Sequence, residues 1–177
     1  MIKSLIKSAT STHKLAFFVV AAAITASAGA AILTPGSGIL SAPVVARGNF
    51  VDPTDIKFKV NDGSQNVINV KRAAETVMQQ IVIAPGGHTG WHSHPGPVVV
   101  LIKTGTMSFY DGDDPSCSAR TYSAGDAFID SGQGHVHIAR NEGSINLELW
   151  ATYFDVPLGV PAPAFRIDVP APGNCPF

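Results

Sequence analysis

The chain is poor in charge. Only 14% of its 177 residues are charged and the formal net charge is −1, whereas roughly a quarter of the residues in an average globular protein are charged. Because 45% of the residues are hydrophobic, the composition excludes an intrinsically disordered chain, which combines high charge with few apolar residues. The sequence also lacks the basic patch that is typical of nucleic-acid-binding proteins, so we expect no nucleic-acid partner. The length fits one domain.

Strong helical periodicity is absent after the N-terminal region. Turn residues are frequent, with 17 Gly and 13 Pro, and short segments that alternate with period two or are wholly apolar lie between them. This pattern predicts an all-β fold, either a sandwich or a barrel. We expect strands over 56–60, 67–71, 76–84, 98–102, 106–110, 119–122, 127–130, 136–139 and 145–154.

No acidic residue precedes Asp52, and the first 14 residues carry three lysines. An apolar stretch over 15–33 follows, and small residues within 26–30 offer A-x-A cleavage sites. This order is typical of a secretory signal peptide, so we assign 1–30 to a signal segment and expect an exported protein. The alternative is an uncleaved membrane anchor over 15–33, because its 19 residues are close to the span length of about 20. No second long apolar run follows, which excludes a multi-span membrane protein.

Composition divides the rest of the chain into three parts. Residues 31–54 are punctuated by Pro, Gly and Ser and are interpreted as a leader. Residues 55–156 carry the β pattern and are interpreted as the barrel. Residues 157–177 contain six prolines, so we expect this C-terminal tail to be extended and packed over the barrel rather than to form a central strand.

Cysteine is scarce, since the chain has only Cys117 and Cys175. Their separation excludes a C-x-x-C redox or zinc motif. An even count in an exported chain predicts one disulfide between them, and two free thiols are the alternative.

Several catalytic motifs are absent, including a phosphate-binding Gly-Lys loop, a dinucleotide fingerprint and a recognisable Ser-His-Asp set. Histidine, in contrast, is concentrated: five of the six histidines lie between residues 88 and 137. His92 and His94 are two residues apart, so on a strand both side chains point to one face, and the same holds for His135 and His137. Because imidazole suits Zn, Fe, Ni and Cu, the two pairs predict a metal site.

The spacing around the first pair resembles the first motif of the cupin family. That motif reads Gly, five residues, His-x-His, three or four residues, Glu, six residues, Gly. Here Gly86, His92, His94 and Gly105 stand at those spacings. The Glu position, however, is occupied by Val98.

The second cupin motif is matched in its metal-binding half. Gly134, His137 and Asn141 have the family's spacing, whereas Gly132 stands where Pro is usual and Gly125 is one residue too far away. The resemblance covers roughly residues 55–156. It implies a double-stranded β-helix, also called a jelly-roll barrel, with metal held inside near one end, and it implies that dimers are common.

Carried over from the family, the predicted metal ligands are His92, His94 and His137. The resemblance implies one divalent transition metal, which the sequence does not identify among Fe, Mn, Zn, Ni and Cu. Since Val98 cannot coordinate, three neutral ligands would leave the ion's charge uncompensated, which favours anionic ligands and lowers the pKa of bound water, towards about 7 for zinc. The alternative is a barrel that lost its metal together with its Glu.

The remaining histidines and Trp91 have simpler interpretations. We expect His135 at the rim of the barrel, with a fourth ligand or a replacement for His137 as alternatives. His88 is expected in a solvated loop before the strand. Trp91 should pack in the core or at the rim and face away from His92.

Acid–base candidates are few. On the last strand Glu148 shares a face with Trp150 and Thr152. It is either an ordinary solvent-facing carboxylate or, if that face lines the cavity, a partner for a histidine N–H or a general base. The sequence does not place the faces of Tyr110 and Tyr122.

Two main hypotheses for function follow. The first is a metal-dependent enzyme acting on a small, anionic organic molecule, either a dioxygenase-like oxidoreductase or an isomerase or hydrolytic enzyme that uses the ion as a Lewis acid. The second is an extracytoplasmic protein that binds a small molecule or metal without turnover. A structural domain with an empty barrel is a third reading. Fold alone does not decide among them.

Overall fold

Strands form all the regular secondary structure of the computed structural model, which describes residues 32–60, 67–161 and 165–177. The predicted signal segment lies outside these residues. No helix within the described ranges is long and apolar enough to cross a membrane. The strands are β1 (Ser37–Ser41), β2 (Val44–Asn49), β3 (Ile56–Lys59), β4 (Val67–Val70), β5 (Glu75–His88), β6 (His92–Ser93), β7 (Val98–Thr104), β8 (Thr106–Asp111), β9 (Arg120–Ser123), β10 (Ala127–Asp130), β11 (His137–Arg140), β12 (Leu147–Val156) and β13 (Ile167–Asp168).

The prediction of an all-β fold is confirmed. Each segment expected to be a strand contains or overlaps one, from β3 to β12, and β5 is longer than expected because it continues through the Pro85-Gly86-Gly87 segment. Four strands have no counterpart in the prediction, namely β1, β2, β6 and β13.

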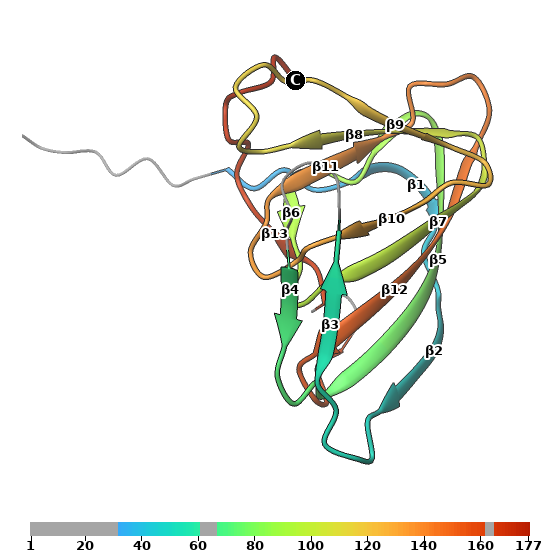
Figure 1. Cartoon of the computed structure of the whole chain (residues 1–177). Helices are drawn as coiled ribbons and strands as arrows, with labels where there is room; N and C mark the ends of the chain where they lie inside the picture. Colours follow the sequence, from blue (N-terminus) through green and yellow to red (C-terminus); the bar gives the residue numbers. More distant parts are fainter. Residues whose placement is uncertain (1–31, 61–66, 162–164) are drawn as a thin grey trace, which may run out of the picture. The chain divides into compact units, whose positions relative to one another are not determined.

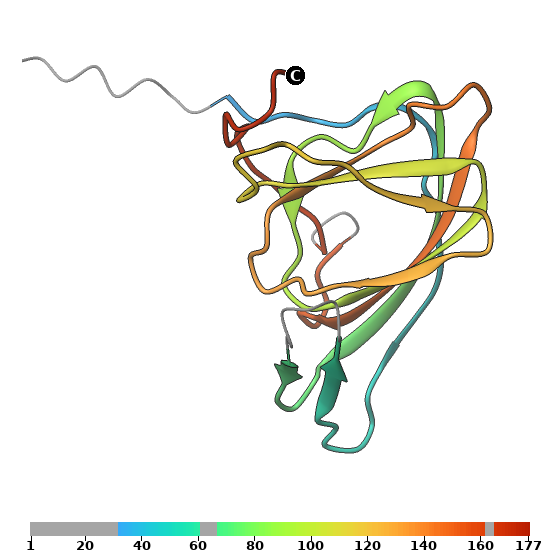
Figure 2. The same ribbon diagram turned by 45° about the horizontal axis from the view of Figure 1, so that its top comes forward.

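Eleven of the described strands form one antiparallel sheet that curls around a core (Figure 1). Its path runs β10-β7-β12-β5-β11-β6-β13. Long registers hold the middle of the sheet, where β12 pairs with β5 on one side and with β7 on the other. The remaining two strands, β3 and β4, pair with each other in a separate hairpin below the barrel in Figure 2.

Residues 37–49, which the sequence analysis treats as part of a leader before the barrel, add two strands to this sheet. β1 and β2 both pair with β5, with Ile39 opposite Ile83 and Arg47 opposite Val77. The physical reason is the length of β5, whose second edge would otherwise leave its backbone groups unpaired. Arg47 also forms an ion pair with the buried Glu75 at 2.5 Å, which ties β2 to the start of β5.

Alternation along β12 fixes which face of the sheet is inside. Leu147, Leu149, Ala151 and Tyr153 are buried, whereas the intervening side chains are only partly buried. The inward residues join an apolar cluster from β5, β7, β8 and β11 that fills the barrel. This core leaves one end of the barrel to polar side chains, and that end holds the histidines.

The predicted disulfide between Cys117 and Cys175 is present. It joins the C-terminal tail to the turn after β8, beside a second apolar cluster built on Trp91, Tyr110 and Ile138. The ring of Phe177 stacks on Trp91 with centroids 6.5 Å apart. The tail is thereby attached to the barrel at its end, and β13 within it pairs with β6.

Candidate metal centre

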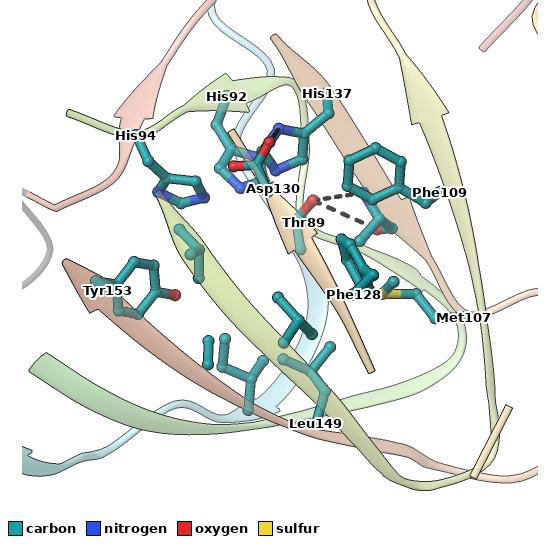
Figure 3. A pocket seen from close by; sticks show the side chains of 15 residues that line it. Thr89, His92, His94, Met107, Phe109, Phe128, Asp130, His137, Leu149 and Tyr153 are labelled. Carbon is teal, nitrogen blue, oxygen red and sulfur yellow. Dashed lines mark hydrogen bonds and ion pairs between the residues drawn. The ribbon is translucent and has the colours of Figure 1, made fainter. Parts of the chain in front are cut away.

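His92, His94 and His137 meet at one end of the barrel (Figure 3). β6 and β11 are antiparallel neighbours in which His92 lies directly opposite His137. His94 follows β6 by one residue, so the predicted spacing of two residues sends both imidazoles into the same cavity. One nitrogen from each of the three side chains lies within 4.8 Å of the others, and all three residues are buried. The structure therefore brings together the three residues predicted as ligands.

Backbone carbonyls determine which nitrogen two of these rings present. The Nδ1–H of His92 donates to the carbonyl of Gly90 at 2.8 Å, and that of His94 donates to the carbonyl of Phe165 at 2.7 Å. A carbonyl only accepts hydrogen bonds, so both rings carry their proton on Nδ1 and keep Nε2 as a lone-pair donor. This is the tautomer and orientation that a metal-binding histidine needs.

The third ring faces a carboxylate. Nδ1 of His137 lies 3.6 Å from Oδ1 of Asp130. That distance is too long for a hydrogen bond, and among the described residues neither Nδ1 of His137 nor Oδ2 of Asp130 has a hydrogen-bond partner although both are buried. A small shift would close a carboxylate–histidine contact of the kind that orients metal ligands.

His135 holds that carboxylate in place from the rim. Its Nδ1 donates to Asp130 at 2.8 Å and its Nε2 lies 3.0 Å from Asp111. These two hydrogen bonds raise the pKa of His135 to about 10. Burial opposes the charge on Asp130, but the nearby histidines still lower the pKa of its carboxyl to about 2.

In contrast to His135, the three histidines predicted as ligands have lowered pKa values. Burial lowers the pKa of His137 to about 4, with a smaller opposing contribution from Asp130. Burial is also the largest cause that lowers the pKa of His92 and of His94. All three imidazoles are therefore neutral at pH 7, which is the form that binds a metal ion.

Val98 lines the cavity that holds the three histidines, at the position where the cupin motif has Glu. This cavity is small, about 40 Å³, and the side chains behind the histidines are mainly apolar, including Met107, Phe109 and Phe128. Among the described residues, Asp130 is the one carboxylate that lines it, and His135 bonds this carboxylate. The three histidines thus offer neutral nitrogen donors, and His137 also belongs to a second group, with Asp130 and His135, whose possible ligand atoms lie within 4.8 Å of one another.

Glu148 does not join this centre. Its carboxylate accepts from Gln80 at 2.6 Å and pairs with Lys103 at 2.9 Å on the outer face of β12. The inward face of that strand carries Leu149, Ala151 and Tyr153 instead. The hypothesis that the Glu148 face lines the cavity is therefore wrong. The face of β12 that carries Leu149 and Ala151 is turned inward, and the face that carries Glu148 and Trp150 is turned outward.

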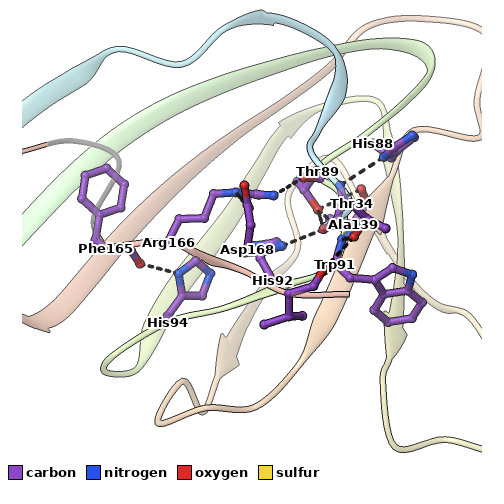
Figure 4. Close-up of polar contacts among 12 residues, drawn as sticks. Thr34, His88, Thr89, Trp91, His92, His94, Ala139, Phe165, Arg166 and Asp168 are labelled. Atoms are coloured by element: carbon purple, nitrogen blue, oxygen red, sulfur yellow. Dashed lines mark hydrogen bonds and ion pairs between the residues drawn. The ribbon is translucent and has the colours of Figure 1, made fainter. Parts of the chain in front are cut away.

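A second pocket adjoins the centre on its outer side and has a volume of about 260 Å³. It shares His92, His94 and Tyr153 with the inner cavity, and Arg166 from the C-terminal tail adds a positive charge to it. Figure 4 shows this side chain extending past His94 and His92 towards Thr89. Sequence reasoning missed Arg166 because a single arginine in a Pro-rich tail, 29 residues after the last histidine, carries no motif.

The other candidates have structural surroundings. His88 is the last residue of β5, not a loop residue, and its Nδ1 accepts from the backbone N–H of Gly90 at 3.1 Å. Trp91 is buried in the second apolar cluster, away from the histidines, as expected. The hydroxyl of Tyr110 donates to Glu142 at 3.0 Å outside the cavity, and Tyr122 stacks on Phe128.

Two motif positions now have physical explanations. Gly132 has φ +58, and a Cβ there would come within 1.8 Å of the Gly96 carbonyl oxygen. Proline cannot adopt a positive φ, so this turn excludes the residue that is usual in the family. Asn141 is buried, and its side-chain amide donates to the carbonyls of Ile83 and Ile145, both at 2.8 Å, which fastens the turn after β11 to β5.

Comparisons with known proteins find similarity among solved structures only, since neither a protein-family model nor a curated protein matches the chain. An oxalate oxidase is 22% identical over 45% of this chain and 41% of its own, with a TM-score of 0.39, so the match spans less than half of that protein. A protein with a double-stranded β-helix domain from Klebsiella pneumoniae subsp. pneumoniae is 19% identical over 67% of this chain and 85% of its own, with a TM-score of 0.42. A cupin domain from Bordetella pertussis is 18% identical over 60% and 99%, with a TM-score of 0.40.

The identification itself comes from the chain's own features. The antiparallel sheet curls around an apolar core, and both motifs fall on the strands and turns expected of them. The three motif histidines meet inside one end of that barrel. This protein has the cupin fold, a double-stranded β-helix.

Proposed function

We propose that this chain is an exported cupin that holds one divalent transition metal through His92, His94 and His137 and acts on a small organic anion. The observation that carries the proposal is the orientation of the histidines. Two of them donate Nδ1–H to backbone carbonyls, at 2.8 Å and 2.7 Å, and keep Nε2 for coordination. A purely structural cluster would have no need for three neutral imidazoles buried side by side without hydrogen bonds joining their rings.

The residues present fit a metal ion by a second criterion. The buried Nδ1 of His137 has no hydrogen-bond partner in the described part of the chain, and the Asp130 carboxylate stands 3.6 Å from it. Ion binding through Nε2 would make the ring N–H a stronger donor to that carboxylate, and such a hydrogen bond orients the ring of a metal-bound histidine. Asp130 is then a positioning residue whose charge His135 holds in place.

A bound divalent ion would supply Lewis acidity at the coordination positions that the three histidines leave open. This chain's own residues supply the rest. The aliphatic and aromatic side chains of the inner cavity would exclude water from the ion, and Val98 supplies no carboxylate ligand at the position where the cupin motif has Glu. The second pocket, which His92 and His94 also line, has room for a small ligand beside them.

Non-catalytic binding is the second candidate, and one observation favours it. Among the residues described around both cavities, the sole carboxylate is Asp130, which is bonded to His135, so no free general base faces the site. Oxygen uptake by iron-loaded protein with candidate carboxylates, thiols or flavonols separates the two. Turnover supports the enzyme, whereas ligand binding without turnover supports the binding protein.

Metal content per protomer tests the site. We expect about one ion in untagged wild-type protein, measured by inductively coupled plasma mass spectrometry, and loss of most of it in His92→Ala, His94→Ala and His137→Ala. His88→Ala is the matched control, because His88 bonds only a backbone N–H and should leave the metal content unchanged. Circular dichroism checks that each variant is folded. Unchanged metal content in the His92 and His137 variants would remove the proposed site.

A further inference from the structure

We propose that Arg166 is an anion-binding residue beside the metal centre, and that the ligand of this protein is a small carboxylate that reaches from Arg166 towards the ion. This inference rests on the proposed function and names its substrate class. The geometric basis is one pocket that contains both Arg166 and two of the three metal-ligand candidates, His92 and His94.

The pocket is built from parts of the chain that flank the barrel motifs. Phe165 and Arg166 come from the tail, and residues 36–42 contribute a second wall from β1 and its two ends. The remaining walls come from β5, β6 and β12 and from the residues that directly follow β5 and β6. Its volume of about 260 Å³ is below the range of about 300–1,000 Å³ for pockets that hold drug-sized ligands. The ligand is therefore a molecule of few heavy atoms.

Arg166 is held by the protein but retains donors for a ligand. Its Nε donates to Asp168 at 2.6 Å and its Nη2 donates to the carbonyl of Thr89. A guanidinium has five N–H donors, so three remain without a partner among the described residues. Asp168 and Thr89 thus fix the plane of the group, and a preorganised planar fork suits bidentate recognition of a carboxylate.

The charges around the pocket favour an anion. Among the described residues that line it none is acidic, and the titratable side chains that share the pocket with Arg166 are those of His92, His94 and Tyr153. Asp168 bonds Arg166 from outside the lining, and Asp130 lines only the inner cavity. An anion entering here meets the guanidinium on one side and the three-histidine centre on the other.

Two further groups restrict the ligand. The hydroxyl of Tyr153 donates to Gln79 Oε1 at 2.9 Å, and the amide of Gln79 donates to the Ala42 carbonyl at 2.7 Å. The Tyr153 hydroxyl proton is therefore engaged by Gln79, and this oxygen can offer a ligand only its lone pairs. Ile39, Ile81 and Phe165 supply apolar walls, which suit a short carbon chain better than inorganic phosphate.

The test compares lactate with lactamide, which has a similar shape without the charge, on metal-loaded protein. Binding is measured by isothermal titration calorimetry, with inorganic phosphate as a third probe. We expect lactate to bind and lactamide to bind at least tenfold more weakly. Arg166→Gln should weaken lactate about 10- to 100-fold, the range for losing hydrogen bonds to a charged group. Arg166→Lys keeps the charge but loses the planar guanidinium, so its affinity for lactate should lie between those of wild type and the Gln variant.

Arg72→Gln is the matched control, since it removes the same charge at an exposed bend and should leave lactate affinity unchanged. Metal content, measured in parallel, should be the same in wild type and both Arg166 variants. Equal lactate affinity in wild type and Arg166→Gln would overturn the inference, as would tighter binding of phosphate or lactamide than of lactate. Should wild type hold no metal, the proposed function fails separately. Lactate binding to metal-free protein that depends on Arg166 would still support the anion-binding residue, and its absence would overturn it.

Discussion

Position 98 determines the charge of the proposed centre. Val98 points into the histidine cavity from β7, where it lies opposite Asp130 of β10 and Tyr153 of β12. Three imidazoles leave the full charge of a divalent ion in place, so an anionic ligand would compensate it. Because Val98 supplies no carboxylate, the metal ligands from the protein are neutral, and this favours an anionic ligand from solution.

A Val98→Glu substitution tests this link. We expect the new carboxylate to coordinate the ion, to raise affinity for manganese about tenfold because hard ions prefer oxygen donors, and to weaken binding of anionic ligands. Val99→Glu is the control, because residue 99 lies outside the cavity lining and pairs with Thr152 on the other face. Competition titration with a chelator measures the affinities. Equal manganese affinity in both variants would show that position 98 does not reach the ion.

For individual residues, the sequence predicted that the three histidines meet at one site, but it did not predict the side chains around them. Motif spacing placed His92, His94 and His137 because strand period and register convert spacing into direction. The same reasoning could not choose between the faces of β12, since Leu149 on one face and Trp150 on the other are both large and apolar. Asp130 lies between Gly125 and Gly132 at a position that the motif does not specify, and Arg166 comes from a segment without a motif, so only the fold could bring them to the histidines.

Among the secondary-structure elements, two short strands and the C-terminal tail hold the histidine site in position. β6 contains two residues and is held between β11 and β13, with Asp168 of β13 opposite His92. The same tail supplies the Phe165 carbonyl to His94 and carries Arg166. A ligand-bearing strand of this length depends on its neighbours for a fixed position.

The disulfide makes this tail part of the folded unit. The bridge encloses a separation of 58 residues, for which the chain-entropy model gives a stabilisation of about 4 kcal/mol. We therefore expect the Cys117→Ser/Cys175→Ser double variant to unfold at lower urea concentration, with a free energy of unfolding lower by about that amount. Fluorescence of the two tryptophans, of which Trp91 lies beside the bridge, follows the transition. A midpoint equal to that of the oxidised wild type would contradict the expected contribution.

Elements that lack their own hydrophobic pattern escaped prediction. All five side chains of β1 are exposed, and only Val44 of β2 is even partly buried. These strands are held by backbone pairing to the edge of β5 and need no alternation of apolar and polar side chains. β6 and β13 have two residues each, too few to show a period.

At the scale of the whole molecule, the all-β fold was predictable from the alternation and turn residues of the central region, because most of its strands turn one apolar face to a common core. Export remains a prediction. A disulfide joining tail and barrel fits an oxidising compartment. The N-terminal sequence of protein recovered from outside the cytoplasm should begin near Gly29 to Ala31. An intact N-terminus in the membrane fraction would indicate an anchor over 15–33 instead.

X-ray absorption spectroscopy of metal-loaded wild-type protein tests the three-histidine centre most directly. Fine structure beyond the edge counts imidazole rings through their multiple scattering and gives the distances from the metal to the atoms bound to it. We expect three imidazole ligands, at about 2.0–2.1 Å for zinc, with the other positions filled by solvent or added carboxylate. Fewer than three imidazoles, or the same spectrum from His137→Ala, would contradict a centre formed by His92, His94 and His137.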